Sequence, residues 1–139
     1  CAVIGVGVAQ RCIDEAVAYS KQRVQFGKPI CKNQAIQFKI ADMEIRTEAS
    51  RQLIAHSIRL ADMGLPFSKE SAAAKCFTGD SVMQTAIDAV QILGGYDYSR
   101  EYPVEKLMRD AKIFQIFEGT NEIQRVVISG NVIRKNKIK

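Results

Sequence analysis

Glu118 is the side chain in this sequence that is best placed for acid–base chemistry. It follows the apolar stretch 113–117, and Gly119 directly after it permits a backbone turn that a Cβ would resist. Asn121 and Gln124 have the spacing of a capping box, which predicts a helix start just beyond the carboxylate. Desolvation of a carboxylate in apolar surroundings raises its pKa towards neutrality. Such a group suits the role of general base for a weakly acidic C–H bond.

A carboxylate at the start of a helix also has a purely structural explanation, because it complements the helix dipole. The neighbouring segments decide between the two. Residues 91–95 (QILGG), 101–110 (EYPVEKLMRD) and 116–125 (IFEGTNEIQR) together resemble the C-terminal signature of acyl-CoA dehydrogenases. Upstream, 23–30 (RVQFGKPI) resembles the Arg-x-x-Phe-Gly segment of that family, and 34–38 (QAIQF) follows at the family's distance. The resemblance covers essentially this whole chain but only the last third or so of the family's usual length.

The resemblance implies a set of site residues. Glu118 matches the catalytic base, and Gly119 matches a position against the acyl thioester. Arg23 matches an arginine that reaches the FAD of a neighbouring subunit. For each position alone, helix capping or packing is an equally good explanation; as a set in family order, FAD binding is favoured. The implied FAD-binding residues are Arg23, Gln25, Phe26, Gln34, Gln91, Gly94, Gly95, Thr120, Asn121 and Glu122.

The implied reaction is α,β-dehydrogenation of an acyl-CoA thioester. Glu118 removes the α-proton, the β-hydrogen leaves as hydride to the flavin, and the electrons then pass to an electron-transfer flavoprotein. The family assembles as a dimer of dimers, and we expect the cytoplasm of a bacterium or the mitochondrial matrix of a eukaryote. A base at this position points to the short-chain, medium-chain or glutaryl-like branches.

Two residues depart from the family pattern. Phe117 stands where the family usually has Tyr, so a hydroxyl is missing beside the base. Asp97 stands where a third glycine is common. Because Asp tolerates left-handed conformations better than most residues, we expect the turn to persist.

Composition places few limits on function. With 139 residues, 47% of them hydrophobic and 25% charged, the chain has the size and composition of one soluble globular domain. No apolar run is long enough for a membrane span, and the first residues lack the basic region of a signal peptide. The four cysteines show no metal-site spacing, so we expect reduced thiols and no metal. The chain starts without Met, as a fragment of a larger flavoenzyme would.

The hydrophobic periodicity predicts only helices. Gly27 and Pro29 end the first, and Gly94 with Gly95 ends the third, which opens at Ser68 as its N-cap. Short loops make neighbouring helices antiparallel, so residues 1–139 are predicted to form a single all-α domain, an up-down four-helix bundle. The predicted helices extend to about 24 for the first, then span about 34–63, 68–93, 104–111 and 121–136.

Two other functions remain open, whereas two other kinds of site lack the residues that they need. A bundle of this kind also serves as a non-catalytic oligomerisation module. The net charge of +5 weakly suggests a relative that binds nucleic acid, but the basic C-terminal cluster of Arg134, Lys135, Lys137 and Lys139 has no interleaved aromatic residues. A ferritin-like metal site needs Glu-x-x-His pairs, and the single histidine, His56, cannot supply them. Residues 5–10 lack the third glycine of a dinucleotide-binding loop.

Overall fold

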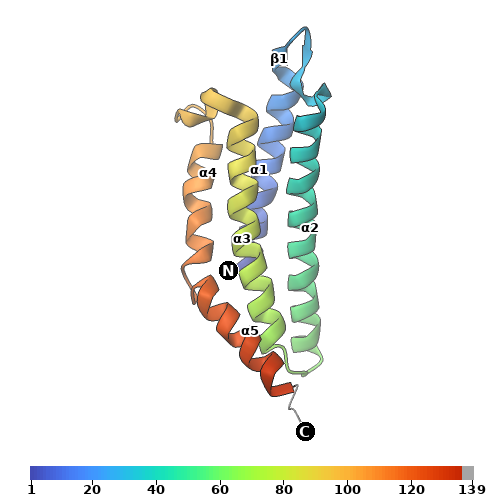
Figure 1. Cartoon of the computed structure of the whole chain (residues 1–139), viewed down its shortest axis with the longest axis vertical. Helices are drawn as coiled ribbons and strands as arrows, with labels where there is room; N and C mark the ends of the chain where they lie inside the picture. Colours follow the sequence, from blue (N-terminus) through green and yellow to red (C-terminus); the bar gives the residue numbers. More distant parts are fainter. Residues whose placement is uncertain (136–139) are drawn as a thin grey trace.

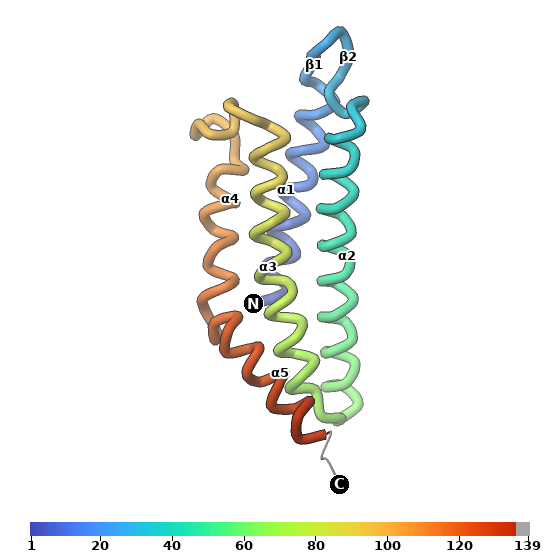
Figure 2. The backbone as a smooth tube through the Cα atoms, viewed as in Figure 1, coloured from blue at the N-terminus to red at the C-terminus, as the bar shows by residue number. Residues whose placement is uncertain are grey.

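The computed structural model describes residues 1–135 of this protein as an elongated helical bundle (Figures 1 and 2). Among the first three helices each runs antiparallel to the one before it, and α4 and α5 follow each other along the remaining side of α3. The all-α fold is confirmed, with the fourth position of the bundle shared by two helices. Residue 136 and the basic residues Lys137 and Lys139 lie outside the described part. The helices are α1 (Ala2–Gln22), α2 (Gln34–Asp62), α3 (Ser68–Leu93), α4 (Val104–Ala111) and α5 (Asn121–Lys135).

The first helix ends two residues earlier than predicted, and a small β-hairpin follows it. Strand β1 (Val24–Gln25) pairs antiparallel with β2 (Lys28–Pro29). Phe26 and Gly27 connect them with φ values of 53° and 76°. Positive φ at both central residues is the geometry of a type I′ turn, which matches the natural twist of a two-stranded hairpin. A short 3₁₀ helix, η1 (Ile30–Lys32), then leads into α2.

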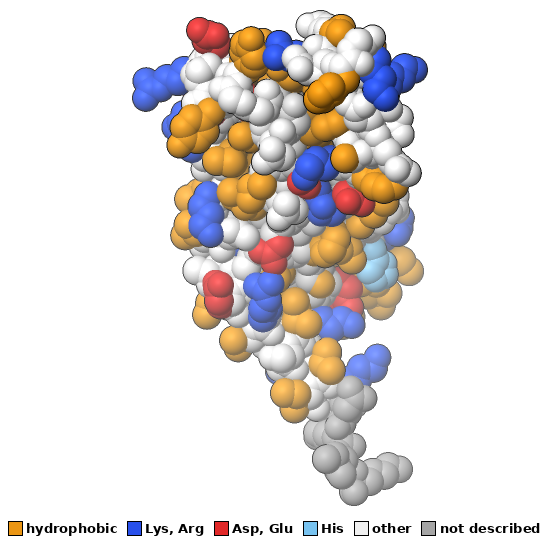
Figure 3. All heavy atoms as spheres, turned by 45° about the horizontal axis from the view of Figure 1, so that its top comes forward, with side chains coloured by type: hydrophobic (Ala, Val, Ile, Leu, Met, Phe, Trp, Pro, Cys, Tyr) orange, Lys and Arg blue, Asp and Glu red, His pale blue; other side chains and the backbone are white. Residues whose placement is uncertain are grey.

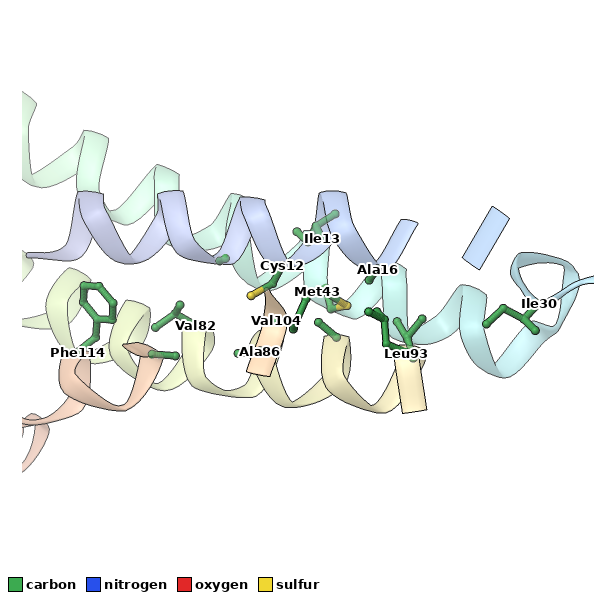
Figure 4. Packing of buried hydrophobic residues seen from close by; sticks show 14 residues of the cluster. Cys12, Ile13, Ala16, Ile30, Met43, Val82, Ala86, Leu93, Val104 and Phe114 are labelled. Atoms are coloured by element: carbon green, nitrogen blue, oxygen red, sulfur yellow. The ribbon is translucent and has the colours of Figure 1, made fainter. Parts of the chain in front are cut away.

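The core forms around α3, which contacts the other four helices (Figure 4). Its inward face carries small residues, so the neighbouring helices approach closely. On α3, Val82, Ala86 and Ala89 share one face of the helix and are fully buried. Along α2 the apolar residues are only partly buried: Met43 is completely enclosed, whereas Ala61 is exposed. These contacts remove apolar surface from water. Each Å² of buried apolar surface contributes a favourable free energy of about 25 cal/mol, which stabilises the bundle.

Two helix caps differ from the predictions by one residue. Ser68 is the first helical residue of α3, and Phe67 occupies the N-cap position without a side-chain hydrogen bond. At α5 the Oγ1 of Thr120 accepts a hydrogen bond of 3.4 Å from the backbone N–H of Ile123, so Thr120 is the cap instead of Asn121. Gly94 ends α3 as predicted, with a φ of 65°.

Short 3₁₀ helices form part of the connections that follow α3 and α4. They are η2 (Gly94–Tyr98) after α3 and η3 (Lys112–Gln115) after α4. Asp97 lies in η2 and is not among the described residues with positive φ, so the turn does not need the left-handed conformation that the sequence suggested at this position. Gly79 on α3 lets η3 pack directly on the helix, because a Cβ there would lie 2.7 Å from the carbonyl oxygen of Phe114.

The described surface adds three findings. No helix within residues 1–135 is both long enough and apolar enough to cross a lipid bilayer. In the same residues, no group of three His, Cys, Asp or Glu side chains lies close enough together to hold a metal ion. On the face drawn in Figure 3, Lys and Arg side chains are scattered among hydrophobic and acidic ones.

Candidate active site

Glu118 lies in a turn with unusual backbone geometry between η3 and α5. Its φ is 54°, and that of Gly119 is 85°, so two consecutive residues are left-handed. This conformation is easy for glycine but unfavourable for a residue with a Cβ. A Cβ on Gly119 would in addition lie 2.8 Å from Nε2 of Gln124. Strain of this kind persists only where surrounding contacts enforce it, and it concentrates at functional sites.

Two side chains from different helices hold the carbonyl groups of this turn. The ammonium group of Lys75, on α3, donates to the carbonyl oxygen of Gly119 at 2.6 Å and to Oδ1 of Asn121 at 2.9 Å. The amide of Gln124, on α5, donates to the carbonyl oxygens of Glu118 and Gly119, each at 3.3 Å. Burial lowers the pKa of Lys75, while nearby acidic groups, Glu118 among them, act in the opposite direction.

Asn121 fastens the beginning of α5 to α3. It is only 2% exposed, and its amide donates to the carbonyl oxygen of Cys76 at 3.1 Å and to Oδ1 of Asp80 at 2.9 Å. Asp80 also accepts hydrogen bonds from Gln115 and Arg125, both at 2.7 Å. Burial alone would raise the pKa of Asp80, but these hydrogen bonds outweigh it and hold the pKa below its usual range.

The carboxylate of Glu118 lies at the rim of a cavity of about 350 Å³. Residues of α1, α2 and α3 line this cavity, including Ile54, Ala74 and Lys75. The side chain of Glu118 is 63% exposed, and its Oε2 lies 3.7 Å from the amino group of Cys1. The described residues therefore do not supply the apolar enclosure that the sequence predicts for this carboxylate, although they place it beside a hollow.

A second cavity, of about 610 Å³, lies between the end of α1 and the beginning of η2. Both of these segments are at the upper end of the bundle in Figure 1. It brings together Arg23, Gln25, Gly94 and Gly95, four of the predicted FAD-binding residues. A Cβ added to either glycine would meet no atom within 4 Å, so open space lies beside both backbones. The cavity therefore has room for a ligand against the backbone.

Three tyrosines support the guanidinium group at this cavity. Tyr19, Tyr96 and Tyr102 form a cluster with ring centroids 5.8 to 6.4 Å apart. The guanidinium carbon of Arg23 lies 4.9 Å from the ring centroid of Tyr96, within the range of a cation–π contact. Among residues 1–135, no carboxylate forms an ion pair with Arg23. Its donors thus remain available for an anionic ligand.

The other predicted FAD-binding residues lie outside this cavity. Phe26, at the tip of the hairpin, is 93% exposed, Gln34 is the first residue of α2, and Gln91 is in the last turn of α3. Thr120 and Glu122 lie with the Glu118 turn, at the start of α5. The structure thus separates the predicted site into one group near Arg23 and another around Glu118.

The hydrogen bonds of the Asn121 side chain limit its predicted role in FAD binding. Its side-chain amide is already used by α3. Only the backbone N–H of Asn121, at the N-terminus of α5, is therefore left for an anionic group of a cofactor. Direct binding of FAD through the side chain stays a prediction, and the buried amide does not favour it.

Comparison with known proteins places this arrangement in a family. Residues 1–133 match the family described as acyl-CoA dehydrogenase, C-terminal domain. This chain is a member of that family. An acyl-CoA dehydrogenase of Bacillus subtilis is 55% identical over 124 residues, which cover 89% of this chain and 33% of the relative. The chain therefore spans about a third of the length of this curated relative.

Solved structures of acyl-CoA dehydrogenases and related proteins contain the same bundle. The butyryl-CoA dehydrogenase of Megasphaera elsdenii has a TM-score of 0.94 and 50% sequence identity, with 96% of this chain and 35% of that chain covered. An FAD complex of PigA has a TM-score of 0.91 at 28% identity, with 94% of this chain and 34% of that chain covered.

Sequence reasoning missed several residues of this acyl-CoA dehydrogenase domain that shape the site. Lys75, Asp80 and the tyrosine cluster were not predicted to take part. One signal for Lys75 was present, because a lysine between Ala74 and Cys76 interrupts a run of small apolar residues on α3. Lysine is almost never buried without a partner, so its position in such a run indicates a polar contact inside the protein.

Proposed function

We propose that this chain is the C-terminal domain of an FAD-dependent acyl-CoA dehydrogenase. The enzyme removes two hydrogens from the α and β carbons of an acyl-CoA thioester, with Glu118 as the base. The observation that carries the proposal is the strained turn of Glu118 and Gly119, which presents a carboxylate at the rim of a cavity. Family membership and the second cavity around Arg23 support it.

The residues around Arg23 fit the diphosphate of FAD. A guanidinium group without an acidic partner in the described chain offers several N–H donors in one plane, which suits phosphate oxygens. Gly94 and Gly95 leave open space where a ligand approaches the backbone. At the other group, the backbone N–H groups at the start of α5 form a site for a phosphate or ribose oxygen.

At the Glu118 turn, each residue has a distinct task. The carboxylate of Glu118 removes the α-proton, and its backbone N–H donates to the thioester oxygen as negative charge develops there. Gly119 has no side chain that would obstruct the acyl group. FAD, when bound, supplies the acceptor for the β-hydrogen. The remaining walls of the pocket, which exclude water from the carboxylate, come from parts of the enzyme beyond this chain.

We extend the proposal to the partners and the location of the enzyme. Its electrons go to an electron-transfer flavoprotein, and the enzyme assembles as a dimer of dimers in which Arg23 of one subunit serves the FAD of another. The separation of the Arg23 group from the Glu118 group supports such sharing. All four cysteines are unpaired, which suits a reducing compartment such as the bacterial cytoplasm or the mitochondrial matrix.

The test compares Glu118→Gln with the parent in the complete enzyme. The amide keeps the shape of the side chain but cannot accept the proton, so we expect a loss of about 10²- to 10⁴-fold in the rate at which butyryl-CoA bleaches the flavin. FAD should stay bound at the parental ratio. The control is Glu105→Gln, which removes a partly buried carboxylate of α4 that pairs with Arg109. Near-parental bleaching by Glu118→Gln would show that Glu118 is structural.

A further inference from the structure

The turn that carries Glu118 needs external restraint to keep its conformation. A non-glycine residue in the left-handed region costs on the order of 1–3 kcal/mol, and here it is followed directly by a second left-handed residue. Four hydrogen bonds from outside this turn reach it or the first residue of α5. Gln124 supplies two long ones, each of 3.3 Å, from an intermediate position near the surface. Lys75 supplies the two shorter ones, of 2.6 and 2.9 Å, from the interior.

The position of Lys75 is costly and therefore informative. Only 8% of this residue is exposed, although lysine normally keeps its ammonium group in water. Within residues 1–135 it forms no ion pair with a carboxylate at salt-bridge distance. Both of its acceptors are neutral oxygens, the carbonyl of Gly119 and the side-chain amide of Asn121. Hydrogen bonds from a charged donor are about twice as strong as neutral ones, so this lysine is well suited to hold a strained carbonyl.

The two hydrogen bonds that Lys75 donates have different structural roles. Its bond to Asn121 belongs to a network that already joins α5 to α3 through Cys76 and Asp80. Its bond to Gly119 reaches the residue next to Glu118, where only the weaker contact of Gln124 provides an alternative. Removal of the ammonium group therefore leaves α5 anchored but releases the peptide that sets the direction of the carboxylate.

We propose that Lys75 is the positioning residue for Glu118: its ammonium group holds the Gly119 carbonyl and so fixes the carboxylate at the rim of the cavity that both residues line. This inference rests on the proposed function, because it concerns the orientation of the base in that reaction. Lys75 itself does not touch the reacting atoms. A displacement of the base by about 1 Å lowers the rate of a reaction by up to about 100-fold without weakening the binding of substrate.

The experiment uses the complete enzyme with Lys75→Met, which keeps a long unbranched side chain but removes the donor. A second variant, Lys75→Arg, retains charge and donors. The matched control is Lys69→Met, the same substitution on the same helix, at a lysine that is 42% exposed and pairs with Glu70. Each variant is measured for bound FAD, for single-turnover bleaching by butyryl-CoA, for the KM of that substrate, and for amide hydrogen exchange of residues 116–123.

We expect Lys75→Met to bleach roughly 10- to 100-fold more slowly per bound FAD, with KM changed by less than about twofold. Exchange at residues 116–123 should become faster, while exchange in α2 stays the same. Lys75→Arg should recover part of the rate, and Lys69→Met should behave as the parent. The inference is overturned if Lys75→Met bleaches at the parental rate, or if it loses rate only in proportion to lost FAD or lost folded protein.

Failure of the proposed function gives a different result. If the parent enzyme does not bleach with butyryl-CoA or longer acyl-CoA thioesters, the dehydrogenase proposal fails whatever Lys75 does. Hydrogen exchange then still decides whether Lys75 holds the turn. Unchanged exchange of residues 116–123 in Lys75→Met overturns the restraint itself.

Discussion

Arg46 on α2 and Asp88 on α3 form an ion pair between these two helices, with 2.5 Å between the guanidinium nitrogen and the carboxylate oxygen. Lys39 contacts the other oxygen of the same carboxylate at 3.1 Å. The side chain of Asp88 is only 11% exposed, and those of Arg46 and Lys39 are partly covered. A single carboxylate thus pairs with two cations at the contact between two helices.

We therefore expect Asp88→Asn to destabilise the domain by roughly 1–3 kcal/mol. Removal of one partner from a fully buried pair costs more, about 3–5 kcal/mol, but Arg46 and Lys39 here remain partly hydrated. The control is Asp110→Asn, which breaks an exposed pair with Lys106 on one face of α4 and should change stability by less than about 0.5 kcal/mol. Urea denaturation of the three proteins gives the free energies of unfolding. Equal effects of the two substitutions would contradict a structural role of Asp88.

Asp97 should make the domain less stable as the pH rises. Its carboxylate is fully buried, and neither oxygen makes a hydrogen bond of normal geometry. Burial raises the pKa of Asp97 from 3.8 to about 6, although the backbone N–H groups of Val104 and Glu105 act in the opposite direction. Between these two values the folded state holds a proton that the unfolded state has lost. Stability therefore falls as the pH rises from about 4 to about 6 and stays lower above that range.

The substitution Asp97→Asn removes this titration. At pH 7.5 we expect it to stabilise the domain by roughly 2–3 kcal/mol, and at pH 4 to change little. Denaturation at the two pH values measures the difference, with exposed Asp42→Asn as the control. If parent and Asp97→Asn show the same dependence on pH, Asp97 does not titrate in this range.

The four thiols should differ strongly in reactivity. Cys12 is fully buried, and burial raises its pKa from 9.0 to about 12, so its thiolate fraction is about a thousandfold smaller at a given pH. Burial also raises the pKa of Cys76. We expect iodoacetamide to modify Cys31 first and to leave Cys12 and Cys76 intact until the protein unfolds. Mass spectrometry of peptides with and without urea locates the labels; early modification of Cys12 would contradict the packing of α1.

The outer face of α2 should take part in self-association. Phe38 and Ile45 are 60% and 65% exposed, and Ile45 lines an apolar depression of about 640 Å³ with Ala41 and Ala49. Exposed apolar surface of this kind marks interaction sites. We expect sedimentation velocity to show an oligomer that Ile45→Glu weakens by at least about tenfold. Tyr98→Glu, which places a carboxylate at another highly exposed apolar side chain, is the control. A parent that sediments as a monomer would remove the assembly proposal.

The local sequence carried enough information for most of the fold. Helix bounds followed from hydrophobic periodicity and from Gly and Pro, because those signals act within a few residues. The hairpin at 24–29 escaped prediction, since its strands have two residues each and cannot show an alternating pattern. The cap of α5 was displaced by one residue because Thr120 and Asn121 are both good cap formers.

The site was less accessible to prediction. The resemblance to acyl-CoA dehydrogenases identified Glu118, Arg23 and the two glycines as candidate site residues. It did not identify the side chains that hold them in position. Lys75 and Gly119 are 44 positions apart in the chain, and only the packing of α5 on α3 brings them together. Exposure of Glu118 was also not predicted, because a run of apolar neighbours does not say whether those side chains cover the carboxylate or face elsewhere.

The chain of 139 residues should neither retain FAD nor dehydrogenate an acyl-CoA when it is purified alone. Arg23 and Glu118 line separate cavities, and each would contact a cofactor from one side only. A flavin left half in water gains too little burial to offset the entropy that binding costs. Excess FAD is added, the protein is desalted, and the visible spectrum is recorded before and after butyryl-CoA. A flavin band of one FAD per chain that bleaches on addition would show that this domain carries the complete site.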